Sequence, residues 1–512
     1  MNASMKRRVF FVALALLLPV ALASCGGGVG TTAGGGTGGT GIGPVTGFGS
    51  VIVNGVRYND AGIGSANFFD DHGRNKSQLM AGMMVAIYGS INGTNGTADN
   101  ITVLRHVDGP MDDNGVDLAT NRLKVMGQDV VVDASIVFDN VITSLADLRT
   151  LQGANVNHPE LEVHGSADTN GVIHATFIHK WSDDRIAGRS VQVRGTVARL
   201  DTGARTFSVG RKTVDYNDLG SIPAGVAAGS FVEVKGTLRA SDNVLLATFV
   251  KLEDATGGQS SGSKAEVEGY VNRVVAPNAS FELLGPNGVQ TVTWTTATTV
   301  FTGGTGADIR AGVKVEVEGT RKDGGALAAT KIAIRRASNI RMESTVTSVT
   351  ASTLTIFGKT VTVNSLTQYE DSRDDDKLFS QTGPHGVQVG DTLEVSAYLD
   401  NSTVPASIVA TRVERIDTIP IDRHILQGTV EGTAGGALLT ILGITAQTIP
   451  GATEFLQVDE TPFPGATPND RQANFFAAVI EGQTTVKVRG TAGSPSVLMT
   501  ANEVQIEPTN DD

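Results

Sequence analysis

Four of the eight histidines lie within a stretch of 22 residues: His158, His164, His174 and His179. Imidazole groups brought together can bind zinc or a similar metal ion. His164 closes one predicted strand, and His174 and His179 lie on the next. On a regular strand, residues five apart point to opposite sides. Scattered surface histidines are therefore the favoured interpretation, and a metal site that includes His164 and His174 is the alternative.

Two acidic segments have the oxygen-rich character of calcium-binding loops. Residues 371–377 read DSRDDDK, and residues 112–117 read DDNGVD. Neither follows the EF-hand spacing that ends in a glutamate. Solvated loop charge is therefore the favoured interpretation. Structural calcium is the alternative, with Asp374, Asp375 and Asp376 as its candidate ligands.

Residues 258–262, GQSSG, match the G-x-S-x-G pattern of a nucleophile elbow. That chemistry requires a strand-to-helix turn, together with a histidine and an acid. Here the match lies in a polar joint, and no helix is predicted to follow. No Walker loop and no Rossmann glycine pattern before a helix occurs in the chain. We therefore predict a protein that is not an enzyme and has no cofactor.

Cys25 is the single cysteine, which excludes an intramolecular disulfide and a cysteine-rich metal site. Three basic residues, 6–8, precede an apolar run at residues 9–21. This run is shorter than the about 20 residues of a membrane-spanning helix. Small residues follow, as in the cleavage region of a signal peptide. Residues 22–25, LASC, resemble the lipobox of bacterial lipoprotein precursors.

This resemblance implies a signal peptide at residues 1–24 and a lipid anchor at Cys25 with acyl chains such as palmitate. Gly26 stands where an aspartate would favour inner-membrane retention, so the resemblance implies the outer membrane. An ordinary secretory signal with a chance cysteine is the alternative. Residues 25–43 hold the lipidated cysteine and a glycine-rich segment, which we expect to be a flexible tether.

The 512-residue chain has 40 Lys and Arg against 53 Asp and Glu, a formal net charge of -13. Nucleic-acid binding needs a dense cationic surface, and no basic stretch follows the leader. We therefore expect no nucleic-acid partner. The 62 glycines and 5% aromatic residues predict a turn-rich protein, whereas 40% hydrophobic residues are enough for folded cores.

One strand pattern recurs along the chain. An alternating segment ends in glycine, as in FVEVKGTL from Phe231, KVEVEGTR from Lys314 and TVKVRGTA from Thr485. A second strand with an Ala-Thr pair follows many copies. Period-two alternation of apolar residues predicts strands buried on one face. The closing glycine suits a bulge or a close approach of two backbones. Ala397 replaces that glycine in the fifth copy.

The pattern repeats at roughly 65 to 85 residues, with about five short strands in each unit. We therefore predict an all-β fold, a tandem array of small five-stranded barrel-like modules, OB-like or SH3-like. A propeller is the structural alternative. The second module shows no clear opening strand, and no long helix is predicted after the leader. The predicted modules are residues 44–107, 108–185, 186–254, 265–337, 338–417 and 418–508, with a linker at 255–264 and a tail at 509–512.

The segment VTGFGSVIVNGVRY from Val45, and the repeated G-x-x-VEV-x-G followed by A-T-x-V/I, resemble bacterial proteins that carry domain of unknown function 5666. The resemblance covers nearly all of the chain after the tether. It implies a β-rich exported protein and supplies no catalytic residues.

These features predict a non-enzymatic lipoprotein of the cell envelope whose tandem β modules serve binding, adhesion or assembly. Its expected partners are the membrane, through the lipid, and an envelope protein or glycan. One alternative is a metal-dependent carbohydrate-binding protein or an envelope enzyme that uses loops of module 2 or module 5. A structural spacer is a further alternative. Ligand identity, oligomeric state, barrel subtype and membrane leaflet stay open.

Overall fold

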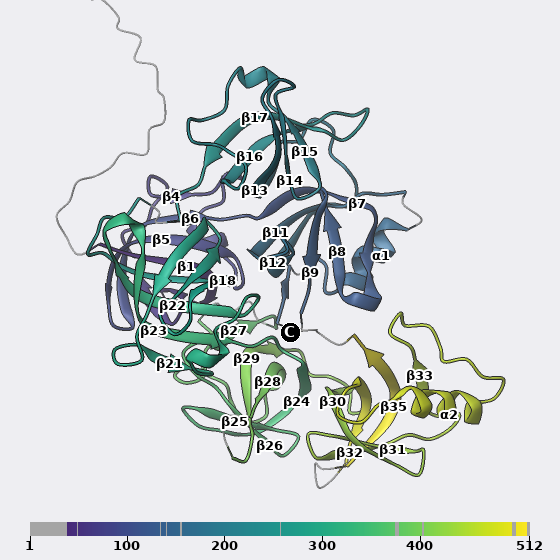
Figure 1. The fold of residues 1–512 in the computed structure, drawn as a ribbon. Coiled ribbons are helices and arrows are strands. Elements are labelled where there is room, and N and C mark those ends of the chain that lie inside the picture. The colour runs from purple at the N-terminus through teal and green to yellow at the C-terminus, as the bar shows by residue number, and fades with distance from the viewer. Residues whose placement is uncertain are drawn as a thin grey trace, which may run out of the picture. The chain divides into compact units, whose positions relative to one another are not determined.

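The computed structural model describes residues 38–508, apart from 49, 134, 140, 154–155, 256–257, 374–377, 402–403 and 494–497. The predicted signal peptide and Cys25 lie outside the described residues. The described part is nearly all β-structure and contains six barrel-like modules in tandem (Figure 1). The predicted all-β tandem array is confirmed.

The strands of the first three modules follow one another along the chain. Module 1 contains β1 (Gly38–Gly47), β2 (Val51–Val53), β3 (Val56–Asn59), β4 (Phe68–Phe69), β5 (Met84–Asn92) and β6 (Asn95–Val103). Module 2 contains β7 (Val107–Asp117), β8 (Arg122–Val125), β9 (Gln128–Val131), β10 (Val137–Phe138), helix α1 (Leu145–Gln152), β11 (Glu160–Ala167) and β12 (Ile173–Ser182). Module 3 contains β13 (Val191–Asp201), β14 (Thr206–Val209), β15 (Lys212–Asp215), β16 (Phe231–Leu238) and β17 (Leu245–Leu252).

The second half of the chain repeats this order. Module 4 contains β18 (Lys264–Ala276), β19 (Ser280–Gly285), β20 (Gly288–Thr293), β21 (Val300–Thr302), β22 (Lys314–Arg321) and β23 (Leu327–Arg335). Module 5 contains β24 (Ile340–Val349), β25 (Thr353–Ile356), β26 (Lys359–Thr362), β27 (Gln368–Asp371), β28 (Thr392–Asp400) and β29 (Ser407–Ile416). Module 6 contains β30 (His424–Ala434), β31 (Leu438–Ile441), β32 (Ile444–Gln447), β33 (Glu454–Leu456), helix α2 (Pro468–Ala478), β34 (Thr485–Ala492) and β35 (Leu498–Glu507).

Each module closes on itself as a five-stranded barrel. In module 5 the strands pair in the order β24-β25-β26-β29-β28 and back to β24, and the β26–β29 pairing is parallel. The other modules share this order, and all except module 3 add one short strand, such as β27, parallel to the last strand. This closed Greek-key arrangement is OB-like and leaves few free strand edges.

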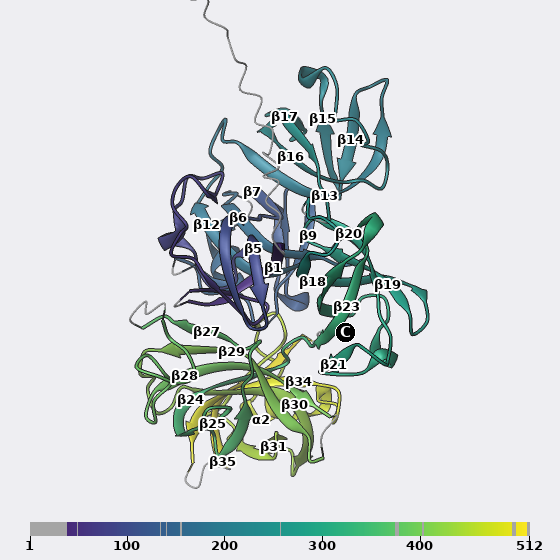
Figure 2. The same cartoon turned by 90° about the vertical axis from the view of Figure 1, so that its left-hand side faces the viewer.

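The opening strands also join modules in pairs, within sheets that Figure 2 shows from a second direction. Strand β1 pairs in parallel with β18, and β7 and β24 pair antiparallel with β13 and β30. The buried apolar residues follow the same pairing, because one core cluster spans modules 2 and 3 and another spans modules 5 and 6. The modules are therefore not structurally independent of one another.

A bulge recurs at the closing glycine of the repeat. At Gly236 the β16–β17 register shifts by one residue, and a Cβ there would lie 1.9 Å from the carbonyl oxygen of Leu246. The same shift occurs before Ala397 in module 5. The glycine thus serves the close backbone approach that the sequence predicted.

The Ala-Thr pair of the repeat supplies the residue opposite this glycine. The bulged residue is a threonine in four modules, and the hydroxyl of Thr330 donates to the carbonyl oxygen of Glu318 at 3.1 Å. In module 2, the hydroxyl of Thr176 donates instead to the carbonyl oxygen of Gly82 in module 1, at 2.7 Å. The module 2 bulge therefore links two modules.

The predicted tether, residues 25–43, extends too far. Residues 38–43 form the first part of β1, and Ile42 is fully buried. Its glycines are packed closely: a Cβ on Gly41 would lie 2.3 Å from the hydroxyl oxygen of Tyr58, and one on Gly43 would lie 2.2 Å from Oδ1 of Asn54. These glycines admit bulky side chains into the barrel, and composition alone does not separate this role from flexibility.

Two short helices were not predicted. Ser144 caps α1, where Leu148 is fully buried. Helix α2 begins with Pro468 after Thr467, which forms a capping box with Asp470. In both helices these caps were the available sequence signal. None of the helices in the described residues is long and apolar enough to span a membrane.

Candidate functional site

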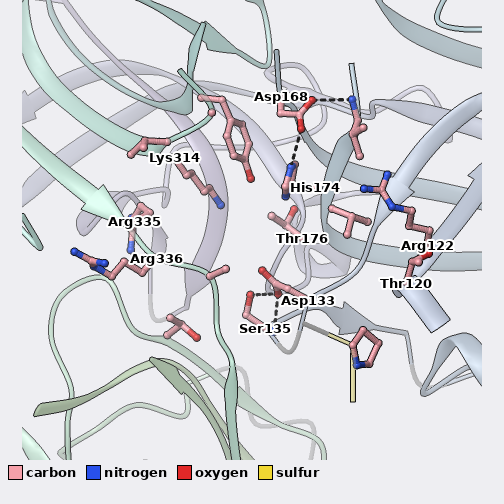
Figure 3. Close-up of a pocket in the computed structure, with 18 of the residues that line it drawn as sticks. Thr120, Arg122, Asp133, Ser135, Asp168, His174, Thr176, Lys314, Arg335 and Arg336 are labelled. Atoms are coloured by element: carbon pink, nitrogen blue, oxygen red, sulfur yellow. Dashed lines mark hydrogen bonds and ion pairs between the residues drawn. The ribbon is translucent and has the colours of Figure 1, made fainter. Parts of the chain in front are cut away.

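A cavity of about 1030 Å³ is lined by residues from five of the six modules (Figure 3). Module 1 contributes Pro44, module 2 His174, module 4 Tyr270, module 5 Gln368 and module 6 Glu507. Its volume lies slightly above the range of about 300–1,000 Å³ that is usual for ligand pockets. The array therefore forms a concave site with walls that no single module supplies.

An aromatic pair and a carboxylate lie on one wall of this cavity. The rings of His174 and Tyr270 are 4.5 Å apart, and Nε2 of His174 lies 3.3 Å from Oδ2 of Asp168 (Figure 3). Burial alone would raise the pKa of Asp168, but hydrogen bonds from His174 and the backbone N–H groups of Asn170 and Val172 lower it overall. Asp168 is therefore ionised and orients the imidazole.

A second carboxylate, Asp133, accepts hydrogen bonds from the backbone N–H and the hydroxyl of Ser135, at 2.7 and 2.5 Å. The serine hydroxyl thus donates to one acid while His174 contacts another, Asp168. A nucleophile–base–acid relay needs serine, histidine and acid in one chain. These four residues are not connected in that way, and they instead offer a set of hydrogen-bonding groups.

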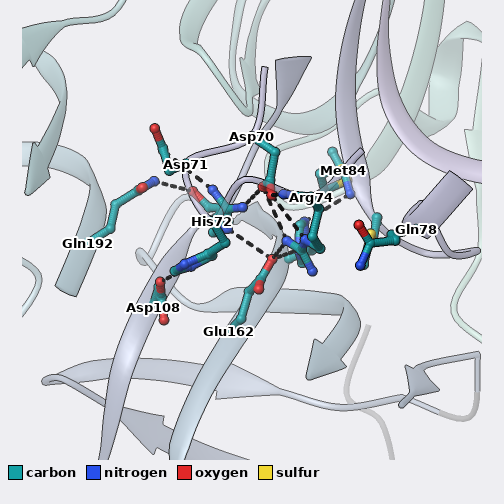
Figure 4. Close-up of polar contacts among 12 residues, drawn as sticks. Asp70, Asp71, His72, Arg74, Gln78, Met84, Asp108, Glu162 and Gln192 are labelled. Carbon is teal, nitrogen blue, oxygen red and sulfur yellow. Dashed lines mark hydrogen bonds and ion pairs between the residues drawn. The ribbon is translucent and has the colours of Figure 1, made fainter. Parts of the chain in front are cut away.

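A buried ion cluster lies at the junction of modules 1 and 2 (Figure 4). Glu162 accepts from Nε of Arg105 at 2.9 Å and from Nη2 of Arg74 at 2.5 Å, and both arginines also pair with Asp70. Burial raises the pKa of Glu162, but His164 and the two arginines hold it well below its ordinary value. Because each buried charge has a partner, the cluster fixes the docking of the two modules.

A second set of ion pairs extends this cluster to the connection between modules 2 and 3. Nε2 of His72 lies 2.6 Å from Asp108 (Figure 4), and Asp108 also pairs with Arg189 at 2.7 Å. The guanidinium groups of Arg74 and Arg189 lie over the ring of Trp181, at 5.7 and 5.6 Å. Cation–π contacts of this kind add to the ion pairs. The ring of Trp181 thus contacts cations of the protein itself.

Three segments, residues 194–251, 268–333 and 343–414, match the family described as Domain of unknown function (DUF5666). The chain carries DUF5666 modules. The matches fall on modules 3, 4 and 5 and confirm the predicted resemblance for these three modules. No curated protein matches the chain. A similar solved structure, "drosophila Unr CSD456", is 15% identical, with a TM-score of 0.11, over 46% of this chain and 100% of that one.

The four clustered histidines, at positions 158, 164, 174 and 179, each contact a different carboxylate. Nε2 of His164 lies 2.6 Å from Glu162, whereas His174 contacts Asp168 and His179 contacts Asp139 at 2.6 Å. Within the described ranges, no group of three or more His, Cys, Asp or Glu side chains is placed to hold a metal ion. His164 and His174 thus serve different contacts.

Two of the three remaining predicted motifs lie within the described residues. Asp374, Asp375 and Asp376 lie outside the described residues. Residues 112–117 are not a loop, because they form the irregular second half of β7, which is the opening strand that module 2 was predicted to lack. The GQSSG segment at residues 258–262 is followed by strand β18 rather than a helix, so it lacks the geometry of a nucleophile elbow.

Sequence reasoning missed the residues that build the cavity and the ion cluster. Tyr270 lies within β18, the opening strand of module 4, and reads as a core residue, and Arg105 lies in the short connection between β6 and β7. Their partners His174 and Glu162 belong to another module. The concentration of histidines in module 2 was the only sequence signal for this region.

Proposed function

We propose that this protein is a non-enzymatic binding protein of the cell envelope, anchored through Cys25, that binds a glycan in the cavity between its β modules. The observation that carries this proposal is the cavity itself, because its walls come from five modules. A tandem array that only spaced two points apart would not need a shared concave site.

The chemistry of the cavity favours a polyhydroxylated ligand. Hydroxyl groups of Thr120, Ser135 and Thr176 lie on its walls, together with the carboxylates of Asp133 and Asp168. Such groups exchange hydrogen bonds with sugar hydroxyls, which both donate and accept. Walls that mix polar groups with a few rings are typical of specific ligand sites. The pair of rings at His174 and Tyr270 supplies the apolar surface on which a sugar ring can stack.

Binding is tested by isothermal titration of the full-length protein in detergent with oligosaccharides released from bacterial envelopes. We expect saturable binding of at least one glycan, and weaker binding by a His174→Gln variant. His158→Gln is the matched control, because His158 is a partly exposed histidine of the same module that does not line the cavity. Heat signals that are absent for every glycan, or equal in both variants, contradict the proposal.

The anchor is tested by metabolic labelling with a fatty acid, comparing the native protein with Cys25→Ser. Label on the native protein alone supports lipid attachment at Cys25, and equal label on both contradicts it. Fractionation of the two membranes then tests the expected outer-membrane location.

The non-enzymatic part of the proposal has its own test. The purified protein is incubated with the glycans that it binds, and the products are separated by size. We expect the glycans to be unchanged. Cleavage or transfer that a single cavity substitution abolishes would replace the binding function with catalysis.

A further inference from the structure

The carboxylates and the cations that line the cavity differ in how many have a hydrogen-bond or ion-pair partner within the protein. Five carboxylates line the cavity, and each has an ion pair or a hydrogen bond to another residue: Asp133, Asp168, Glu268, Asp308 and Glu507. Two of the five cations are satisfied as well, because Lys314 pairs with Glu268 at 2.9 Å and Arg335 with Glu316 at 2.7 Å.

The other three cations that line the cavity are Arg122, Arg310 and Arg336. All three are exposed, and none of their guanidinium groups makes a hydrogen bond or an ion pair with another described residue. Two of these arginines act on Asp308 through their charge. Hydrogen bonds from Thr305 lower the pKa of Asp308, and the charges of Arg336 and Arg310 lower it further. The cavity therefore presents guanidinium groups whose donors remain available.

These arginines come from separate elements, so they are not a single charged run on one strand. Arg122 begins β8 of module 2, Arg310 precedes β22 of module 4 and Arg336 follows β23. Arg122 lies across the cavity from Arg335 and Arg336 in Figure 3. A guanidinium fork matches the geometry of a carboxylate or phosphate, with two parallel hydrogen bonds.

The three exposed arginines stand out against the charge of the whole chain. A formal net charge of -13 repels anions at long range, so free cations at a cavity oppose the general trend of the surface. Charge pairs inside a concave site are screened less than pairs on an open surface. Unsatisfied arginines there are consequently a source of selectivity between charged and neutral ligands.

We infer that the ligand of the cavity is an acidic oligosaccharide, and that Arg122, Arg310 and Arg336 bind its carboxylate or phosphate groups. This inference rests on the proposed glycan-binding function and specifies its chemical class. Sugar hydroxyls meet the polar wall around Asp133 and His174, while the anionic groups meet the arginines on both sides.

A pair of probes that differ only in charge tests this inference. Oligogalacturonate carries a carboxylate on each sugar, and its methyl ester has the same sugars without the charge. Titration of the full-length protein should give binding of the acid form that is about tenfold or more tighter than binding of the ester. Raising the salt concentration should weaken only the acid form.

Arginine variants locate the effect. Arg122→Gln, Arg310→Gln and Arg336→Gln should each weaken acid binding by about threefold to thirtyfold and leave ester binding unchanged. Arg423→Gln is the matched control, because Arg423 is exposed and does not line the cavity. Since the side chains of the three cavity arginines make no hydrogen bond or ion pair with another described residue, the melting temperature of each variant should match the native protein.

The outcomes separate the inference from the function on which it rests. Equal binding of acid and ester, unaffected by the arginine variants, overturns the acidic ligand and leaves a neutral glycan site. Binding of neither probe nor any envelope glycan overturns the proposed function as well. Inorganic phosphate that binds as tightly as the oligomer would reduce the site to an anion site and also overturn the inference.

Discussion

The ring nitrogen Nδ1 of His164 accepts a hydrogen bond from the backbone N–H of Met84, at 3.1 Å, and so joins module 2 to module 1. The other ring nitrogen, Nε2, lies 2.6 Å from Oε1 of Glu162, and the ring is fully buried. A neutral imidazole satisfies both contacts, because it carries one donor and one acceptor. A second proton, on Nδ1, would point at the N–H of Met84.

This contact predicts an acid-sensitive junction. Burial lowers the pKa of His164, and so do Arg74 and Arg105, against the opposing effect of Glu162. The unfolded chain therefore binds more protons than the folded one below pH about 6.5, and stability falls as the pH drops from that value. We expect urea titrations between pH 7.5 and 5.0 to show a loss of stability that is smaller in His164→Asn, which keeps an acceptor for Met84.

His158→Asn is the control for this prediction, because His158 is partly exposed and contacts the exposed Asp113. Its pH dependence should follow that of the native protein. An unchanged slope in His164→Asn, or an equal change in both variants, would show that the buried ring does not control the junction.

Glu266 predicts the opposite slope with pH. It lies directly opposite Glu318 in the β18–β22 ladder and is 3% exposed, and burial, followed by Glu316 and Glu318, raises its pKa to about 9. The unfolded carboxyl ionises near pH 4.5, so its contribution to stability is full below that pH and is lost as the pH rises toward 9. Glu266→Gln should therefore stabilise the protein by about 2–3 kcal/mol at pH 7.

Urea titrations of both proteins at pH 5, 7 and 8.5 check this prediction. The gain from Glu266→Gln should grow with pH, because the glutamine has no proton to lose. Glu454→Gln, on an exposed residue of β33, should show no such growth. A destabilising effect of Glu266→Gln at pH 8.5 would mean that the buried carboxyl is ionised and paired.

The glycine-rich strand β1 predicts a coupling between Gly41 and Tyr58. A Cβ at Gly41 would lie 2.3 Å from the hydroxyl oxygen of Tyr58 and 2.9 Å from its Cζ. Gly41→Ala should destabilise the protein by about 1–3 kcal/mol, because it overpacks the core. Tyr58→Phe removes the nearest atom, so the double variant should lose less than the sum of the single changes.

Gly62→Ala is the control for that cycle, because no heavy atom lies within 4 Å of a Cβ there. It should leave stability within about 0.5 kcal/mol of the native value. Additive losses in the double variant would show that the hydroxyl of Tyr58 does not set the space at Gly41.

The recurring bulge predicts a reciprocal pair of substitutions. A Cβ at Gly236 would lie 1.9 Å from the carbonyl oxygen of Leu246, whereas module 5 holds Ala397 at the equivalent position. Gly236→Ala should therefore destabilise the protein by about 1–3 kcal/mol. Ala397→Gly should cost less, at about 1 kcal/mol, because it leaves no clash. Thermal unfolding measures both, and equal losses would contradict the packing role of the glycine.

The repeat alone was enough to predict the fold. Val232 and Val234 alternate with polar residues before Gly236, and this period of two predicts a strand with one buried face. Copies of that strand at regular spacing predict a tandem array, and the closing glycine predicts a bulge. These properties depend on neighbours along the chain, so a reader of the sequence can see them.

Tertiary structure decided which residues meet across modules. Arg105 and Glu162 are 57 residues apart, and Arg122 and Arg336 line one cavity from different modules. It also decided that Gly41 fills a tight strand rather than a flexible tether, because that role depends on the distant Tyr58. Alternation of residue types reports local burial only. The pairing of β1 with β18 and of β7 with β13 sets the partners, and such long-range contacts leave no periodic mark in the sequence.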